Sequence, residues 1–286
     1  MKAQTISRRE FLTASALAVP LAHALSALAQ TKKIPVGLEL YSVRTEYGRD
    51  LPGTVTRVAK MGYEVVEFWA PYYDWTPAQA KDVRKLLDDL GIKCHSTHNS
   101  GTAVTPEGLK KAIELNQIIG SKNIIQASAP PARNIDDWKQ LAAKLTSFSE
   151  QLNPLGMATG YHNHQVEWRA LEGQRPMDVL AANTPKDVVL QFDVGTCIEA
   201  GADPIAWINA NPGRIKSVHC KDWGAGAGRG YGVAFGEGDA PWVKIFDAVE
   251  KAGGIEYYLI EQEQSPTGQQ FAMAEKCLEN WKRLRG

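Results

Sequence analysis

Four short apolar stretches in the second half of the chain end in residue types that bind metal ions. They cover 160–164, 191–195, 217–222 and 258–261. Each is strand-like and has His, Asp or Glu among its last residues. Their key residues recur at roughly the length of one strand–helix unit, about 30 residues. Successive strands of a parallel barrel would deliver such residues to one point, so the spacing favours a metal-dependent barrel enzyme.

Strand-like and helix-like segments alternate along most of the chain. Strands are predicted over 36–41, 64–69, 92–97, 123–126, 158–162, 188–193, 215–219 and 257–261. Helices are predicted over 51–61, 77–90, 106–119, 135–152 and 268–285, with Gly62, Gly91 and Gly120 as stop signals. Since a (β/α)8 barrel needs about 250 residues, the 286-residue chain predicts one such barrel. A doubly wound sheet is the alternative, which eight units in one uninterrupted chain disfavour.

The N-terminus carries the signs of an export signal. The pair Arg8 and Arg9 precedes a small-residue apolar stretch over 13–29, which ends in the cleavage-site pattern Ala27-Leu28-Ala29. We therefore predict a twin-arginine signal peptide over 1–29 and a barrel domain over 33–286. The twin-arginine export machinery would deliver the protein to the periplasm without a stable membrane anchor. The alternative is an N-terminal anchor, for which the stretch is only weakly hydrophobic.

Charge and cysteine content exclude several other classes. Lys plus Arg and Asp plus Glu both number 32, so no net charge favours nucleic acid or an anionic membrane. A metal-dependent nuclease would need a basic groove and more ligands. The four cysteines are widely spaced, which indicates neither a zinc knuckle nor a disulfide scaffold.

Four side chains are predicted to converge at the mouth of the barrel as metal ligands: His162, Asp193, His219 and Glu261. Carboxylates combined with imidazole suit one divalent ion, with Mn²⁺ preferred and Mg²⁺, Co²⁺ or Zn²⁺ as alternatives. Taken singly, three of these residues could have a purely structural role. Asp193 could cap a turn, His219 could be a hydrogen-bonded core histidine, and Glu261 could lie on a solvated strand end.

Six motifs resemble the xylose isomerase-like barrel superfamily, whose members are also called sugar phosphate isomerases/epimerases. They are LELYSVR at 38–44, YHNH at 161–164, FDVGT at 192–196, HCKDW at 219–223, GEGDAPW at 236–242 and YYLIEQEQ at 257–264. The resemblance covers roughly 34–285. It implies a divalent metal held by Glu, Asp, His and Glu, and Asp193, His219 and Glu261 match the last three. The chain departs at the first ligand, which either His162 or Glu167 would supply.

The residues around this centre include groups able to move protons. Glu261, Glu167 or His164 would remove a proton next to a carbonyl, and Lys221 would stabilise the oxygen anion that develops. The alternative for Lys221 is an ion pair with loop carboxylates. Carbohydrate contacts are predicted for Asn163, His98, Trp69, Trp223 and Glu39. Asn163 could instead orient ligands, and ordinary packing is the alternative for the tryptophans.

The glycine-rich stretch 224–238 is predicted to form a lid over the barrel mouth, with Arg229 a candidate for an acidic substrate group. The predicted activity is that of a divalent-metal-dependent sugar isomerase or epimerase, which acts through an enediolate on a free sugar or keto-sugar. The alternative is a lyase or dehydratase on a keto-sugar, inosose or 3-keto-glycoside. A third hypothesis is a non-catalytic periplasmic sugar-binding protein. A homo-oligomer is left open.

Overall fold

A closed barrel of parallel strands forms the centre of the chain. The computed structural model describes residues 33–285, and within them the strands follow one another around the barrel in sequence order. They are β1 (Val36–Glu39), β2 (Val65–Phe68), β3 (Lys93–Asn99), β4 (Asn123–Gln126), β5 (Ala158–His162), β6 (Val189–Asp193), β7 (Ser217–Cys220) and β8 (Tyr257–Ile260). Closure is completed where Val36 of β1 pairs with Tyr258 of β8. The predicted (β/α)8 barrel is therefore confirmed.

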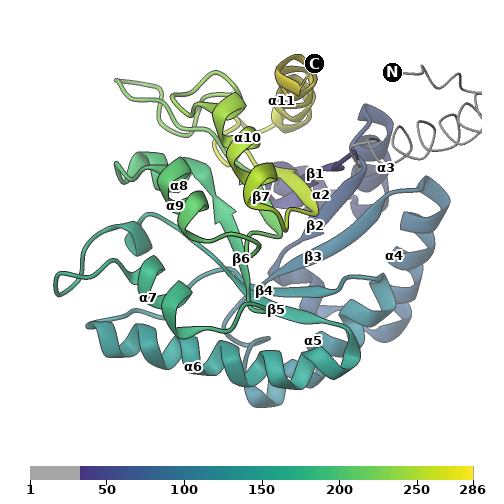
Figure 1. Ribbon diagram of the computed structural model, residues 1–286. Coiled ribbons are helices and arrows are strands. Elements are labelled where there is room, and N and C mark those ends of the chain that lie inside the picture. Colours follow the sequence, from purple (N-terminus) through teal and green to yellow (C-terminus); the bar gives the residue numbers. More distant parts are fainter. Residues whose placement is uncertain (1–32, 286) are drawn as a thin grey trace, which may run out of the picture. The chain divides into compact units, whose positions relative to one another are not determined.

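Helices follow the strands and surround the barrel (Figure 1). The α-helices are α2 (Arg44–Arg49), α3 (Leu51–Met61), α4 (Pro77–Leu90), α5 (Pro106–Ile119), α6 (Ile135–Leu152), α7 (Pro176–Asn183), α8 (Val194–Glu199), α9 (Pro204–Ala210), α10 (Trp242–Ala252) and α11 (Gln270–Arg285). Short 3-10 turns are η1 (Leu40–Val43), η2 (Ala70–Asp74), η3 (Asn153–Leu155) and η4 (Val166–Trp168). The core lies between the barrel and this outer layer, where most buried apolar side chains gather.

The bounds of four long helices agree with the sequence prediction because local signals set both ends. The Thr76 hydroxyl accepts the Gln79 N–H and the Gln79 side chain reaches back, so a capping box starts α4. Thr105 caps α5 in a similar way. Gly91 ends α4 with a φ of 68°, a left-handed conformation that glycine adopts without a Cβ penalty.

Two strands end two residues away from their predicted ends. The Glu39 carboxylate accepts the Tyr41 N–H and starts η1, so β1 ends two residues early. In contrast β3 extends beyond 97, because His98 and Asn99 pair with Ile125 and Gln126 of β4. His98 is therefore held on a strand rather than in a loop.

Gly160 allows two strands to pack closely below the mouth of the barrel. A Cβ added there would lie 2.5 Å from the Val189 carbonyl oxygen of β6, so a larger residue would push β5 away from β6. This spacing sets the separation of the strands that carry His162 and Asp193.

The predicted signal peptide over 1–29 lies outside the described residues. The barrel and its helices form one compact unit, Pro35–Gly286. Among the helices of residues 33–285, none has both the length and the apolar character needed to cross a bilayer.

Candidate metal centre and substrate pocket

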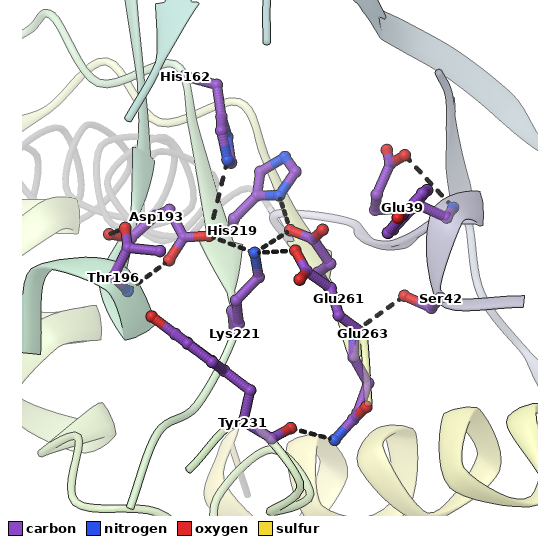
Figure 2. Close-up of polar contacts among 12 residues, drawn as sticks. Glu39, Ser42, His162, Asp193, Thr196, His219, Lys221, Tyr231, Glu261 and Glu263 are labelled. Atoms are coloured by element: carbon purple, nitrogen blue, oxygen red, sulfur yellow. Dashed lines mark hydrogen bonds and ion pairs between the residues drawn. The ribbon is translucent and has the colours of Figure 1, made fainter. Parts of the chain in front are cut away.

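The four predicted metal ligands come together at the mouth of the barrel. One ligand atom from each of His162, Asp193, His219 and Glu261 lies within 4.8 Å of the others, and all four residues are buried. His162 and Asp193 end β5 and β6, His219 lies on β7, and Glu261 directly follows β8. Figure 2 shows their side chains converging from these separate elements. The structure thus gathers the residues, while their role as ligands stays a prediction.

His219 is held by a carboxylate on each side of its ring. Its Nδ1 atom lies 2.8 Å from Oε2 of Glu261, and its Nε2 atom lies 2.9 Å from Oε2 of Glu67. Burial lowers the pKa of the imidazole, but the two carboxylates outweigh burial and raise that pKa to about 9. Without a bound cation, His219 is thus a cation itself at neutral pH.

Glu67 is a site residue that the sequence analysis missed. It lies on β2, is fully buried, and accepts hydrogen bonds from the Ser96 hydroxyl and from Nε2 of Gln191, the latter at 2.9 Å. Its Oε2 atom also lies 3.2 Å from Nε2 of His98. Burial raises the pKa of this carboxyl, but His98 and His219 reverse the effect and lower the pKa to about 2. The available signal was a glutamate inside an otherwise apolar strand.

Lys221 places an ammonium group between the carboxylates. Its Nζ atom lies 3.0 Å from Oδ2 of Asp193, 3.2 Å from Oε2 of Glu261 and 2.6 Å from Oε1 of Glu263 (Figure 2). The residue is only 3% exposed. Burial lowers the pKa of Lys221, yet the three carboxylates outweigh burial and raise that pKa well above its ordinary value. The ion-pair alternative for Lys221 is observed, and it involves two of the predicted metal ligands.

Two buried atoms in the cluster still lack a hydrogen-bond partner. They are Nδ1 of His162 and Oδ2 of Asp193, and the latter forms an ion pair with Lys221 and lies 3.7 Å from Nε2 of His162. Burial, followed by the neighbouring His219 and His98, lowers the pKa of His162 well below its ordinary value, so its ring is neutral. A neutral imidazole and carboxylates are the form in which these side chains bind divalent cations. His162, Asp193 and Glu261 therefore fit such an ion, and His219 would fit it after releasing one proton.

A cavity of about 470 Å³ opens above the cluster, a size that suits a small-molecule ligand. Three predicted substrate contacts line it, namely Glu39, Trp69 and His98. Trp69 packs edge-on against Tyr41, which also lines the cavity, with ring centroids 5.8 Å apart. Polar and charged side chains complete much of the wall, including those of Ser128, His162, His164, Lys221, Tyr231 and Glu261.

Asn163 braces the ligands and lies outside this lining. Its Nδ2 atom donates to the Asp193 carbonyl at 3.1 Å and to the Thr196 hydroxyl at 2.9 Å, while its Oδ1 atom accepts the Asp193 N–H at 3.0 Å. Both N–H groups and the oxygen of the Asn163 amide are therefore engaged in hydrogen bonds within the protein. The predicted substrate contact is corrected to a positioning role, which the sequence analysis had named as the alternative.

Glu167 is also turned away from the metal cluster. One carboxylate oxygen accepts the His164 backbone N–H at 2.7 Å and the other accepts the Tyr161 hydroxyl. Both oxygens therefore hold the turn after β5. This geometry favours His162 over Glu167 as the first ligand. His164 lines the cavity, whereas Glu167 does not.

The glycine-rich stretch contributes Tyr231 to the cavity in place of the predicted Trp223. The Asp222 carboxylate holds the base of this stretch, accepting the Gly236 N–H at 2.9 Å and the indole N–H of Trp242 at 2.8 Å. Trp223 is not part of the cavity lining, whereas Tyr231 is. Nothing in the spacing of the sequence singled out Tyr231, because its direction depends on these loop contacts.

Two polar contacts hold the hydroxyl of Tyr231 in place. The Tyr231 hydroxyl donates to Glu199 at 2.8 Å and accepts from the Gln165 amide at 2.6 Å.

Arg229 pairs with Asp239 at 3.2 Å and donates to the Glu237 carbonyl, so the idea that it recognises a substrate acid is not supported.

Comparison with known proteins identifies the class of this barrel. The model of the family described as "Xylose isomerase-like TIM barrel" matches residues 55–281. The chain therefore belongs to the xylose isomerase-like TIM barrel family.

Named relatives include a rhizopine catabolism protein and several inosose dehydratases. The rhizopine catabolism protein MocC of Rhizobium meliloti is 24% identical over 77% of this chain and 78% of its own length. An inosose dehydratase of Lacticaseibacillus casei is 28% identical over 46% of this chain and 49% of its own length, so that match spans about half of the enzyme. The solved structure of a sugar phosphate isomerase/epimerase from Parabacteroides distasonis has a TM-score of 0.72 and 25% identity, and covers 88% of this chain and 94% of its own.

Proposed function

We propose that the chain is a divalent-metal-dependent sugar isomerase or epimerase that acts on a free sugar or keto-sugar. The observation that carries this proposal is the buried cluster of His162, Asp193, His219 and Glu261 beneath a polar and aromatic cavity. A divalent ion bound there, for which Mn²⁺ is our first choice, would act as a Lewis acid toward a substrate carbonyl.

The chain's own residues would handle the proton. Glu261 and His164 both line the cavity, so either could remove the proton next to the carbonyl and return it. Glu167 was the third candidate, but its engaged oxygens make it a support for His164. The Lys221 ammonium would stabilise the negative charge that develops on a substrate oxygen of the enediolate.

A lyase or dehydratase is the second candidate function. It is favoured by the relatives named inosose dehydratase, at 26% identity over 78% of this chain for that of Geobacillus thermodenitrificans. Both reactions begin with the same proton removal, and loss of a β-oxygen from the enediolate would then replace reprotonation. Inososes, keto-sugars and 3-keto-glycosides all carry such an oxygen.

Metal content and proton exchange test the proposal together. We expect about one divalent ion per purified chain, and exchange of a carbon-bound proton of a keto-sugar or inosose in heavy water. The double variant Asp193→Ala/His219→Ala should lose both. Asp247→Ala, which alters an exposed ion pair on α10, is the matched control. Exchange without loss of water supports an isomerase or epimerase, and an unsaturated product supports a lyase. A metal-loaded chain that binds sugars without exchange would favour the sugar-binding protein.

We also propose that the protein works in the periplasm after twin-arginine export. The supporting features are Arg8 and Arg9 followed by the apolar stretch over 13–29. Replacing both arginines with lysine should retain the uncleaved chain in the cytoplasm, as judged by fractionation and N-terminal sequencing. Correct cleavage near residue 29 in that variant would refute this route.

A further inference from the structure

A second hollow leads outward from the cavity above the metal cluster. Its volume is about 510 Å³, and its lining shares Ser128 and His164 with that cavity. The two spaces therefore meet at the rim of the candidate active site. We call the second hollow the outer groove.

The walls of the outer groove are mainly apolar. Pro130 and Pro131 of the segment before α6 form part of one wall, and Val166 and Leu171 of the segment after β5 form part of the other. Trp138 of α6 also lines it and is only 3% exposed. Prolines carry no N–H donor, so apart from the exposed Arg169 these walls offer few hydrogen bonds to a polyol.

Hydrogen bonds connect the two walls and fix their separation. The Glu172 carboxylate, from the segment after β5, accepts the backbone N–H of Ile135 at the start of α6 at 3.0 Å. The Glu167 carboxylate holds the inner end of the same segment through the His164 N–H. Val166, between these points, is 55% exposed, which leaves a large apolar side chain facing open space.

We propose that the outer groove binds a flat, apolar substituent carried by the sugar whose ring occupies the cavity at the metal cluster. The occupant is thus the aromatic aglycone of a glycoside. Continuity at Ser128 and His164 places a substituent of a bound sugar directly at the entrance of the groove. The exposed side chains of Pro130, Pro131 and Val166 favour a flat ring, since they offer apolar area to it. This inference rests on the second candidate function, a lyase acting on a 3-keto-glycoside, because it assumes that the sugar ring of such a glycoside binds at the cluster.

Paired glycosides test the outer groove by isothermal titration of the metal-loaded chain. The probes are methyl and phenyl glycosides of glucose, galactose and xylose, which differ within each pair only in the substituent. Burial of the phenyl ring should make the phenyl member bind roughly tenfold more tightly. In Val166→Asp that ratio should fall toward one, with the affinity for the methyl member unchanged.

Val243→Asp is the matched control, because Val243 is 61% exposed on α10 and lies outside the lining of the groove. Its phenyl-to-methyl ratio should equal that of the parent. Leu171→Asn is a second groove variant and should also reduce the ratio. An equal affinity for both members of every pair, no binding of any pair, or a ratio unaffected by Val166→Asp would overturn the inference. An equal gain from an uncharged disaccharide would overturn the choice of an aromatic occupant. The proposed function is tested independently of the outer groove, by the measurements of metal content and proton exchange.

Discussion

The Nε2 atom of His219 lies 2.9 Å from Oε2 of Glu67, while Nδ1 of the same ring lies 2.8 Å from Oε2 of the predicted metal ligand Glu261. A histidine that binds a metal through one ring nitrogen usually donates the N–H of the other to a carboxylate. The contact with Glu67 would keep a proton on Nε2, so that Nδ1, the atom facing Glu261, could bind a cation once it releases its own proton. Glu67 is thereby the residue that orients His219.

Replacing Glu67 with Gln should weaken divalent-metal binding by about 10- to 100-fold, the usual effect of losing such a partner. The substitution keeps the volume of the side chain but removes the charge that His98 and His219 face. Metal affinity can be measured by competition with a fluorescent chelator. Glu256→Gln, at a half-exposed ion pair, should keep the parent affinity. Equal affinities for the Glu67 variant and the parent would exclude the orienting role.

The chelator-treated chain should lose stability as the pH rises through the range from about 6.5 to about 9. The pKa of His219 is raised to about 9 in the folded chain from an ordinary 6.5, so its contribution is complete below 6.5 and lost as the pH passes 9. Glu67 limits stability at low pH. Its pKa is lowered to about 2 in the folded chain, so its stabilising contribution is present above about pH 4.5 and is lost as the pH falls from there toward 2. The raised pKa of His219 and the lowered pKa of Glu67 arise from the same contact between the two side chains. Its contribution to the free energy of unfolding is therefore counted once.

Urea unfolding midpoints measured across this range provide the test, with His219→Asn as the comparison. The parent should show a declining midpoint above about pH 6.5, and the variant should show a flatter profile. Metal affinity of the parent should rise over the same range, because binding must release the proton from His219. A parent profile as flat as that of His219→Asn would show that the two carboxylates do not hold a charged imidazole.

Replacing Lys221 with Met should separate stability from metal binding. The ammonium compensates the buried carboxylates of Asp193 and Glu261, so its loss should destabilise the metal-free chain by about 3–5 kcal/mol. The same uncompensated carboxylates should hold a divalent cation more tightly, and added metal should restore much of the stability. Proton exchange into substrate should nevertheless fall by about 100-fold or more, because the group opposite the developing oxygen anion is absent.

Lys251→Met is the control for that experiment, since Lys251 forms an exposed ion pair within α10. Its free energy of unfolding should change by less than about 1 kcal/mol. Weaker metal binding in Lys221→Met would contradict the compensating role of Lys221. Unaltered proton exchange would remove Lys221 from the reaction.

The elements that sequence predicted best are those whose limits are set by neighbouring residues. Thr76 and Gly91 bound α4 through contacts within a few positions, so a local pattern is sufficient there. Asp193, His219 and Glu261 could be grouped because each lies at or next to the carboxyl end of a strand of a recognisable barrel. The fold then brings them to one end.

Residues whose role depends on distant partners were harder to predict. Glu67 acquires its role from His98 and His219, and no local pattern tells which side of β2 faces the barrel interior. Tyr231 reaches the cavity only because the contacts of Asp222 hold its loop. Trp223 is adjacent in sequence to the same carboxylate and does not line the cavity. Aromatic content alone could not separate these two residues.

Trp69 and Trp223 offer a direct comparison of a lining and a non-lining tryptophan. Trp69→Ala should raise KM for the substrate by roughly tenfold, since it removes apolar surface from the wall shared with Tyr41. Trp223→Ala should leave KM within about twofold of the parent, because that ring lies outside the lining. Steady-state kinetics of both variants on one substrate, with circular dichroism to confirm folding, would measure the difference. A larger KM effect for Trp223 than for Trp69 would mean that the substrate binds under the glycine-rich stretch rather than in the cavity beside Trp69.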